Sequence, residues 1–472
     1  MTSRVWIIAG GILALTAVVF AAACASTPMR VATGFMANVA CSQTFISGLD
    51  TDQVIADTSM AMPGVGLIDW GLNVRIDQDR KEVETSFLGF ARTRAVYRTG
   101  RGCTLVHDDE KAIPPVVLPE PYRGPVLLPD IAGQDIVRAQ DARLVAALEG
   151  AFAEPPQPPF RRTRAVVILK DGRIIAERYA PGIGVDTPIA GFSATKSVTN
   201  ALIGILVRQG KLSLDTPAPV AAWADLADPR HAITVDHLLR HTSGLAMGSS
   251  MNASLWSAFD PVNEMKFGQR DMAAFAEAAR VETTPGTAWN YHDGNYLILS
   301  RLIRDAAGGR AQDVLQLAEN ELFGPLGMRN VTIEFDATGT PEVSTEMFAP
   351  ARDWARFGQL YLQDGVLAGT RILPEGWIPR TIRATPSAWM GMGAGFWTNQ
   401  GENEGTRIRL GFGMPKDAFF ARGMFGQYVI VVPSERLVVV RLGVTGGPRQ
   451  DMEGVIRLIN DVIAATRAGA GS

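Results

Sequence analysis

The chain has 472 residues, of which 47% are hydrophobic and 20% are charged, and its formal net charge is −3. This is the composition of a globular protein, and without an excess of basic residues nothing points to nucleic-acid binding. The length allows two or three domains.

The N-terminus departs from globular composition. Residues 5–24 follow Arg4, carry no charge and are almost wholly apolar, ending in Ala21-Ala22-Ala23-Cys24. Three interpretations fit: a cleaved signal peptide, a lipoprotein signal with Cys24 acylated, or an uncleaved anchor, since about 20 apolar residues can span a bilayer. Each predicts an exported protein of the cell envelope, periplasmic or membrane-anchored, with membrane contact through residues 1–25 or a lipid on Cys24.

Two cysteines remain when Cys24 is set aside. An even pair in an oxidising compartment favours a disulfide between Cys41 and Cys103 over two buried free thiols. The bond would close a small N-terminal module, residues 30–110, in which residues 83–90 and 94–98 have the pattern of short strands.

Residues 111–159 are predicted to be a connector, because six prolines lie between residues 111 and 130 and another cluster lies at 155–159. Between the two clusters, residues 136–152 have the pattern of an amphipathic helix. The main domain, residues 160–468, opens with two strand-like runs that flank Asp171-Gly172, a typical hairpin turn.

Ser193 and Lys196 form the only Ser-x-x-Lys of a chain that has just seven lysines. Apolar residues follow at helical spacing, and Gly210 stands where a C-cap glycine belongs. We therefore expect Ser193 to open a helix, with Lys196 one turn on and roughly 5–6 Å away between Cβ atoms. A serine hydroxyl becomes a nucleophile when a base takes its proton, and a lysine can serve if its pKa is lowered. The alternative is a surface serine and lysine on an ordinary helix.

Residues 210–380 are predicted to be mostly helical. Within them Tyr291 follows a Pro-Gly turn and directly precedes an apolar helix. A tyrosine near a lysine ammonium can act as a general acid or base; the alternative is a packing tyrosine at a helix start.

Three strands, residues 418–424, 427–432 and 437–444, and a closing helix, residues 451–465, are predicted near the C-terminus. Gly423 lies at a strand end, where a missing side chain lets a substrate approach the backbone, although a tight turn explains it equally. Strands at both ends of the domain with helices between them predict an α+β fold: an antiparallel sheet of N- and C-terminal strands, flanked by helices, with a mostly helical insertion.

Ser193-x-x-Lys196, Tyr291-x-Asp293 and the strand with Gly423 stand in an order that resembles the serine β-lactamase and penicillin-binding superfamily. More narrowly, the chain resembles the class C β-lactamase-related serine hydrolases, which include carboxylesterases and the 6-aminohexanoate-dimer hydrolase. Residues 236–245 and 353–360 are similar to segments of that family. The resemblance covers roughly residues 160–465 and implies a β-lactamase/transpeptidase-like fold.

The resemblance also implies roles for individual residues. Ser193 would be the acylated nucleophile, Lys196 would take its proton or keep the network charged, and Tyr291 would pass the proton to the leaving group. The backbone N–H groups of Ser193 and Met424 would form an oxyanion hole, and Asp293, Arg422 and Gly423 would contact the substrate. The expected reaction is hydrolysis of a small ester or amide through an acyl-enzyme, without cofactor or metal.

Two departures from the family pattern narrow the expected class of substrate. Asp293 stands where β-lactamases carry Asn, and Ala421-Arg422-Gly423 replaces Lys-Thr-Gly. An ionised Asp cannot donate a hydrogen bond to a substrate amide, so both changes suit an esterase or amidase better than a penicillin hydrolase.

Other functions remain open. A β-lactamase or D,D-peptidase, and a non-catalytic envelope protein that binds peptidoglycan fragments, share the fold. A Ser-His-Asp hydrolase lacks support because no G-x-S-x-G motif is present. His237 and His241 share i,i+4 spacing, but H-E-x-x-H is absent, which argues against a metal site.

Overall fold

A computed structural model describes the chain except residues 1–21, 23–25, 108–115, 252–254, 448 and 470–472. The predicted signal or anchor segment, residues 1–25 with Cys24, therefore lies outside the described residues except for Ala22. In the part that is described, no helix is both long enough and apolar enough to cross a bilayer.

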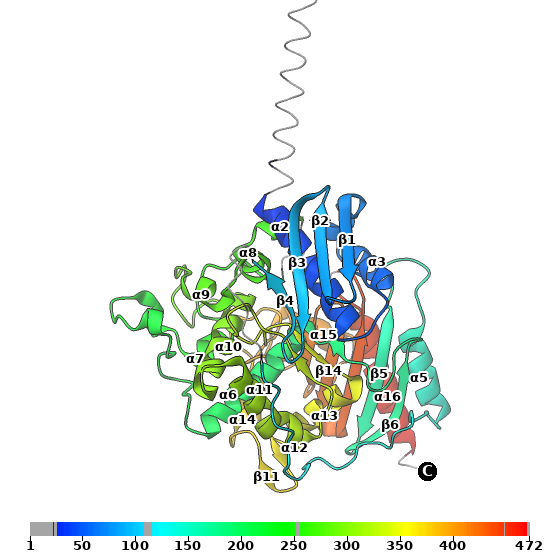
Figure 1. Ribbon diagram of the computed structural model, residues 1–472. Coiled ribbons are helices and arrows are strands. Elements are labelled where there is room, and N and C mark those ends of the chain that lie inside the picture. The colour runs from blue at the N-terminus through cyan, green and yellow to red at the C-terminus, as the bar shows by residue number, and fades with distance from the viewer. Residues whose placement is uncertain (1–21, 23–25, 108–115, 252–254, 448, 470–472) are drawn as a thin grey trace, which may run out of the picture.

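A six-stranded antiparallel sheet forms the centre of the main domain, in the order β12-β13-β14-β15-β5-β6. It joins the first strands of the domain to the last ones, as the sequence predicted (Figure 1). The strands are β5 (Thr163–Lys170), β6 (Arg173–Tyr179), β12 (Trp397–Thr398), β13 (Phe419–Gly423), β14 (Gln427–Val432) and β15 (Leu437–Gly443). Asp171 and Gly172 both have positive φ, 54° and 82°, as a two-residue type I′ turn requires.

Successive side chains of a strand face opposite sides of the sheet, so each face has its own core. Val166 and Ile168 of β5 belong to one apolar cluster, with α5 (Ala142–Phe152) and α16 (Met452–Gly469). Val167 and Leu169 belong to the other, with α6 (Thr195–Arg208) and α13 (Ala351–Leu362). The predicted helix over residues 136–152 is correct only from Ala142 onward, because Asp141 is the N-cap and accepts hydrogen bonds from the Arg143 and Leu144 N–H groups.

Helices and loops between β6 and β12 make up the second half of the main domain (green and yellow in Figure 1). Besides α6 and α13, these helices are α7 (Val235–Leu239), α8 (Pro261–Gly268), α9 (Met272–Glu277), α10 (Asp293–Ala307), α11 (Ala311–Ala318), α12 (Gly324–Leu326) and α14 (Trp377–Ile382). A further helix, α15 (Glu404–Gly411), lies between β12 and β13. Short strands complete it: β7 (Ile189–Ala190), β8 (Thr332–Ile333) and β9 (Met347–Ala349) form one small sheet, and β10 (Val366–Leu367) pairs with β11 (Thr370–Arg371).

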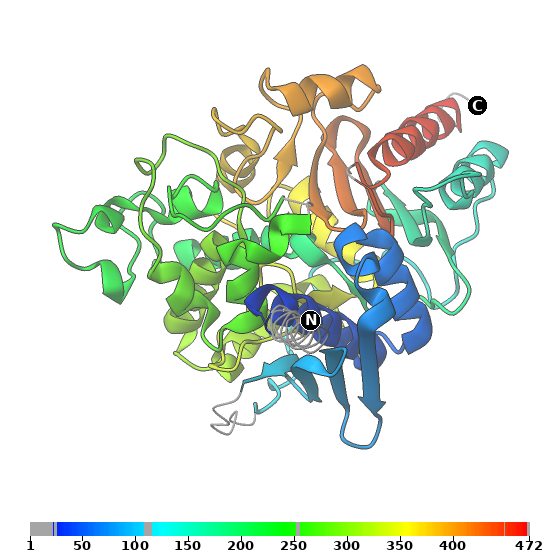
Figure 2. The same cartoon turned by 90° about the horizontal axis from the view of Figure 1, so that it is seen from above.

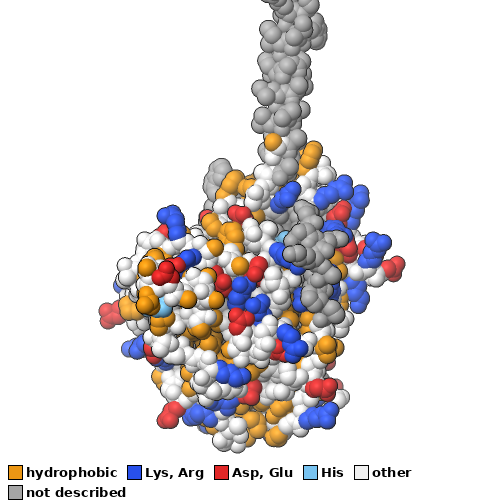
Figure 3. Space-filling model, turned by 60° about the vertical axis from the view of Figure 1, so that its left-hand side comes forward, with side chains coloured by type: hydrophobic (Ala, Val, Ile, Leu, Met, Phe, Trp, Pro, Cys, Tyr) orange, Lys and Arg blue, Asp and Glu red, His pale blue; other side chains and the backbone are white. Residues whose placement is uncertain are grey.

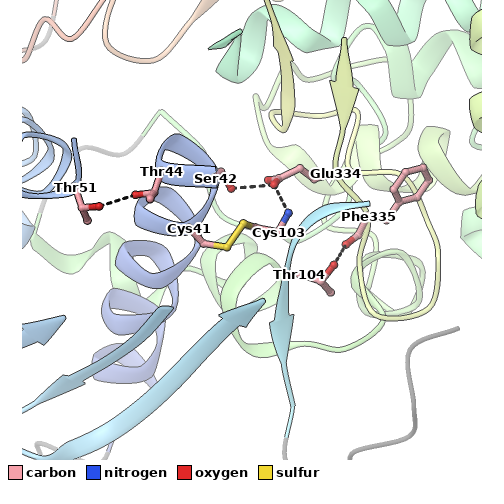
Figure 4. The surroundings of a disulfide bond; sticks show 8 residues. All are labelled: Cys41, Ser42, Thr44, Thr51, Cys103, Thr104, Glu334 and Phe335. Carbon is pink, nitrogen blue, oxygen red and sulfur yellow. Dashed lines mark hydrogen bonds between the residues drawn. A yellow bond between two sulfur atoms is a disulfide. The ribbon is translucent and has the colours of Figure 1, made fainter. Parts of the chain in front are cut away.

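The N-terminal module has a sheet of its own, in the order β1-β2-β3-β4. Its elements are α2 (Thr27–Phe45), α3 (Thr51–Ala61), α4 (Pro63–Gly66), β1 (Leu72–Asp77), β2 (Glu82–Phe87), β3 (Phe90–Arg98) and β4 (Gly102–Val106). The structure joins Cys41 of α2 to Cys103 of β4 in a disulfide, with the two Cα atoms 6.1 Å apart. Beside the bond, Glu334 of the main domain accepts hydrogen bonds from the Ser42 hydroxyl and the Cys103 N–H (Figure 4).

The module packs closely against the main domain. Figure 2 shows α2 and α3 (blue) lying against both the helical half (green) and the sheet (orange and red). Phe35 of α2 shares an apolar cluster with Phe192 and Phe425 of the main domain. At the edge of this contact, Asp57 of α3 forms ion pairs with Arg162 and Arg164. The turn that carries Ser193 is therefore packed from one side by the module.

Candidate active site

Ser193 lies in a single 3-10 turn, Phe192–Ala194, between β7 and α6. The α-helix begins two residues later, at Thr195, so the serine stands in the turn that leads into the predicted helix. Phe192, directly before it, has φ 46°, a left-handed conformation that is uncommon for a bulky side chain. Such conformations persist only where the surroundings hold them. Here Phe192 is buried, and its ring packs edge-to-face on Phe425 at 5.2 Å.

Lys196 places its ammonium at the centre of the site. Its Nζ donates a hydrogen bond to Ser193 Oγ at 3.3 Å, as the Ser-x-x-Lys spacing predicted. The same nitrogen lies 2.5 Å from Asp293 Oδ1 and 3.0 Å from Ser344 Oγ, and Ser344 Oγ also donates to Asp293 Oδ1 at 2.8 Å. The lysine side chain is only 1% exposed, so these groups take the place of water around it.

The ion pair with Asp293 decides the charge of Lys196. Burial alone would lower the pKa of the lysine, but the attraction of Asp293, and then of Tyr291, outweighs it and leaves the pKa raised. Burial alone would raise the pKa of Asp293, but the charges of Lys196 and Lys266 outweigh it and lower that pKa. The raised pKa and the hydrogen bond to Ser193 Oγ both favour Lys196 as a charged donor to the serine.

Tyr291 lies in the loop before α10, as predicted, and its ring is buried. Lys196 Nζ stands 5.1 Å from the centre of that ring. Two other rings also pack against Tyr291. The ring centre of His241 lies 4.3 Å from that of Tyr291, and the ring centre of Trp397 of β12 lies 5.9 Å from it. The first and second predicted motifs thus meet at the lysine ammonium.

Two histidines behind Tyr291 are neutral. Asn295 of α10 lies within hydrogen-bond distance of His241 Nδ1, 3.3 Å, and His292 Nε2, 3.2 Å. Burial lowers the pKa of His292 to about 4, and burial followed by the charge of Lys196 lowers the pKa of His241 well below its usual range. The hydrogen bonds of both rings go to Asn295 and backbone and not to Ser193, so neither ring is placed as a serine-activating base.

The third motif, the strand that ends in Gly423, lies against the serine turn with its backbone. A Cβ added to Gly423, the last residue of β13, would overlap the carbonyl oxygen of Gly191 and approach Phe192 Cβ to 3.1 Å. A residue with a side chain would therefore hold β13 away from the turn. With glycine, the backbone of Gly423 lies next to Gly191 and Phe192, directly before Ser193.

Arg422 also belongs to this region. Its guanidinium lies 5.8 Å from the ring centres of both Trp397 and Tyr428, and Trp397 packs on Tyr291. The structure thus places Ser193, Asp293 and the ring of Tyr291 around Lys196 and Gly423 against the serine turn, and it links Arg422 to Tyr291 through Trp397.

Two participants were not foreseen from the sequence. Ser344 is hydrogen-bonded to both Lys196 and Asp293. Lys266 of α8 donates to Thr345, the residue that follows Ser344. Lys266 is buried among Glu342 and Glu346, at 3.5 and 3.4 Å. Neither lies in a motif; the rarity of lysine in this chain was the one available signal for Lys266. The structure also gives Asp293 a partner, Lys196, where the sequence suggested only a substrate contact.

Several known proteins are similar to this chain in sequence or fold. A family model described as Beta-lactamase matches residues 156–463. Protein Rv1367c of Mycobacterium tuberculosis is 30% identical over 296 residues, which are 51% of this chain and 70% of that protein. The 6-aminohexanoate-dimer hydrolase of Paenarthrobacter ureafaciens is 25% identical over 294 residues, 59% of this chain and 72% of that protein. The crystal structure of a penicillin-binding protein homologue from Caulobacter crescentus matches 70% of this chain and 100% of its own with a TM-score of 0.52; at 20% identity it shows the shared fold.

Proposed function

Because the chain belongs to the Beta-lactamase family, we propose that it is a serine hydrolase that forms an acyl-enzyme on Ser193 with a small ester or amide substrate. One observation carries the proposal: a buried ammonium donates directly to the hydroxyl of a serine that a strained turn holds in place. The name of one relative, a 6-aminohexanoate-dimer hydrolase, supports an amide bond as one substrate class.

In the proposed acylation step, Tyr291 acts as the phenolate and takes the proton of Ser193 while Oγ attacks the carbonyl carbon. Lys196 stays charged and stabilises the negative charge on the phenolate and on Oγ. Tyr291 then gives the proton to the departing alcohol or amine, and in deacylation it takes a proton from the attacking water. This division of labour follows from the raised pKa of Lys196, which favours its role as a fixed charge over that of a base.

The oxyanion is proposed to bind between the N–H groups of Ser193 and Met424. Gly423 supports this role because it lets β13 approach the serine turn. Arg422, at the rim beside Trp397, is proposed to contact the polar end of the substrate.

A fluorophosphonate probe tests the proposal, since it labels activated serines covalently. We expect labelling of the wild-type chain, its loss in Ser193→Ala and a strong reduction in Lys196→Ala. Ser434→Ala, on the surface turn after β14, is the matched control and keeps full labelling. Wild-type protein that binds muropeptides but resists the probe would instead be a non-catalytic envelope protein.

A substrate panel separates the remaining alternatives. We expect turnover of a short p-nitrophenyl ester or of a linear amide oligomer, and slow or no hydrolysis of a β-lactam, because Asp293 Oδ1 is occupied by Lys196 and Ser344. Rapid β-lactam turnover, or cleavage of a D-Ala-D-Ala peptide in preference to the ester, would favour the β-lactamase or D,D-peptidase alternative.

We also propose that the protein is exported and stays attached to, or close to, the membrane through residues 1–25. The sequence of residues 5–24 supports this proposal. Fractionation of the producing cells tests it: the protein is expected in the membrane or periplasmic fraction, and recovery with cytoplasmic markers would refute it.

A further inference from the structure

Four large apolar side chains stand exposed at one end of the N-terminal module: Leu67, Trp70, Leu88 and Phe90, which we call the hairpin-end patch. Each is at least 41% exposed, and Trp70 is 70% exposed. Single exposed apolar side chains are common, but a contiguous group marks a surface that contacts something other than water.

Backbone and ring contacts bring Trp70, Leu88 and Phe90 together, and Leu67 lies three residues before Trp70. Leu88, in the turn between β2 and β3, donates its N–H to the Gly71 carbonyl at 2.9 Å. Trp70 packs edge-to-face on Phe87 at 5.5 Å, and Phe87 pairs with Phe90 across the hairpin. A surface hollow of about 370 Å³ lies beside them, lined in part by Trp70, Leu88, Arg75, Arg92 and Glu84.

The hairpin-end patch lies where the N-terminal segment joins the described chain. Thr33 of α2 bonds to the Ala91 carbonyl at 2.8 Å and to the Thr93 hydroxyl at 2.9 Å, both at the start of β3. Thr27, the first residue of α2, is six residues earlier, or about 9 Å along the helix axis. Figure 1 shows the start of α2 and the start of β3 at the same end of the molecule. Only Ala25 and Ser26 separate Thr27 from the uncharged apolar residues 5–24.

The charges around the hairpin-end patch suit an anionic surface. Arg30, Arg75 and Arg92 are exposed, and Asp69 is the exposed acidic neighbour of Trp70. Figure 3 shows hydrophobic and basic side chains on this end of the molecule. Tryptophan favours the interface between lipid and water, and arginine is attracted to anionic head groups.

We propose that the hairpin-end patch rests on the surface of the lipid bilayer to which residues 5–24 attach the chain. The tether and the patch would then act as two contacts to one membrane and would fix the orientation of the catalytic domain on it. This inference rests on membrane attachment and not on the hydrolase activity.

Quenching of tryptophan fluorescence by lipids brominated on the acyl chains tests the proposal, with the full chain reconstituted in liposomes that contain anionic lipid. Trp6 lies within residues 5–24, so its quenching reports attachment itself. We expect Trp70→Phe to lose a further part of the quenched signal. Trp389→Phe is the matched control and should leave the quenched part unchanged. Trp389 is 54% exposed, but its ring lies beside that of Trp289, which packs 6.1 Å from Tyr291.

A charge variant gives a second measurement. Leu88→Glu combined with Phe90→Glu should keep the quenching of Trp6 and lose that of Trp70. The proposal is overturned if Trp70→Phe quenches as the wild type does, or if Trp70 is shielded from aqueous acrylamide without being quenched by lipid, which would mean that protein covers the patch. Absence of all quenching, that of Trp6 included, overturns it together with the attachment.

Discussion

At the scale of single residues, the charge of Lys196 governs how the site can work. The ammonium, the Asp293 carboxylate and the Ser344 hydroxyl form a compact polar group from which water is excluded. Removing one member of a buried ion pair leaves the other uncompensated, which costs far more than the pair itself contributes.

Asp293→Asn is therefore expected to lower the free energy of unfolding at pH 7 by about 3 kcal/mol. The dependence on pH should also change. In the wild type the pKa of Lys196 lies above its ordinary value of 10.5, so its stabilising contribution is constant between pH 7 and 10 and is lost only as the pH rises through the raised pKa. Without Asp293, burial lowers that pKa, the unfolded chain binds the proton more tightly, and the free energy of unfolding rises with pH up to about 10. Urea unfolding between pH 7 and 10 measures this; parallel curves for the two proteins would contradict it.

Lys196→Ala and Tyr291→Phe are each expected to lower kcat/KM for a p-nitrophenyl ester by about 10²–10⁴-fold, the usual contribution of a positioned acid–base group. Tyr291→Phe should remain folded by circular dichroism because it keeps the ring packing. Lys196→Ala leaves the buried Asp293 carboxylate without its ion pair and should be less stable, so its rate is measured at a temperature where circular dichroism shows it folded. Near-wild-type rates in both variants would show that the roles are assigned to the wrong residues.

At the scale of elements, β13 and the serine turn meet without any side chain between them. Gly423 permits this close approach, because a Cβ there would overlap the carbonyl oxygen of Gly191.

Gly423→Ala is expected to push β13 away from the turn and to lower kcat by about 10²-fold, comparable to the loss of one oxyanion donor. Gly411→Ala, at the end of α15, is the matched control, because an added Cβ there meets nothing within 4 Å. Steady-state kinetics of both variants checks this, and equal rates would mean that the approach of β13 has no catalytic role.

Elements with local signals were predictable from the sequence. Asp171-Gly172 indicates the β5–β6 hairpin and apolar runs indicate the C-terminal strands, so the antiparallel sheet of N- and C-terminal strands was predictable. Its strand order and the short strand β12 were not predicted. The Ser193–Lys196 contact is also local, since one helical turn fixes it. Ser344 and Lys266 reach the site from segments far away in sequence, and no periodicity in their own segments points to it. The start of the connector helix was predicted too early because the apolar spacing continues past the Asp141 cap.

At the scale of the whole molecule, the disulfide closes a loop with a sequence separation of 62 residues. Replacing both cysteines, Cys41→Ser with Cys103→Ser, is expected to lower the free energy of unfolding of the module by about 4 kcal/mol, through the loop-closure entropy of the unfolded chain. Mass spectrometry of non-reduced peptides from envelope-derived protein should find the bond, and two free thiols there would refute the pairing. Ser42→Ala, which loses a hydrogen bond to Glu334 but keeps the bond between the sulfurs, is the control.

The packing of Phe35 against the cluster of Phe192 and Phe425 has a practical consequence for protein engineering. The segment that matches the family begins at residue 156, after the module. A chain truncated at that boundary would expose apolar surface next to the turn that carries Ser193. This exposure would promote aggregation and would make the turn less rigid. Swaps or fusions with relatives should carry residues 27–106 along and place any added tag after α16.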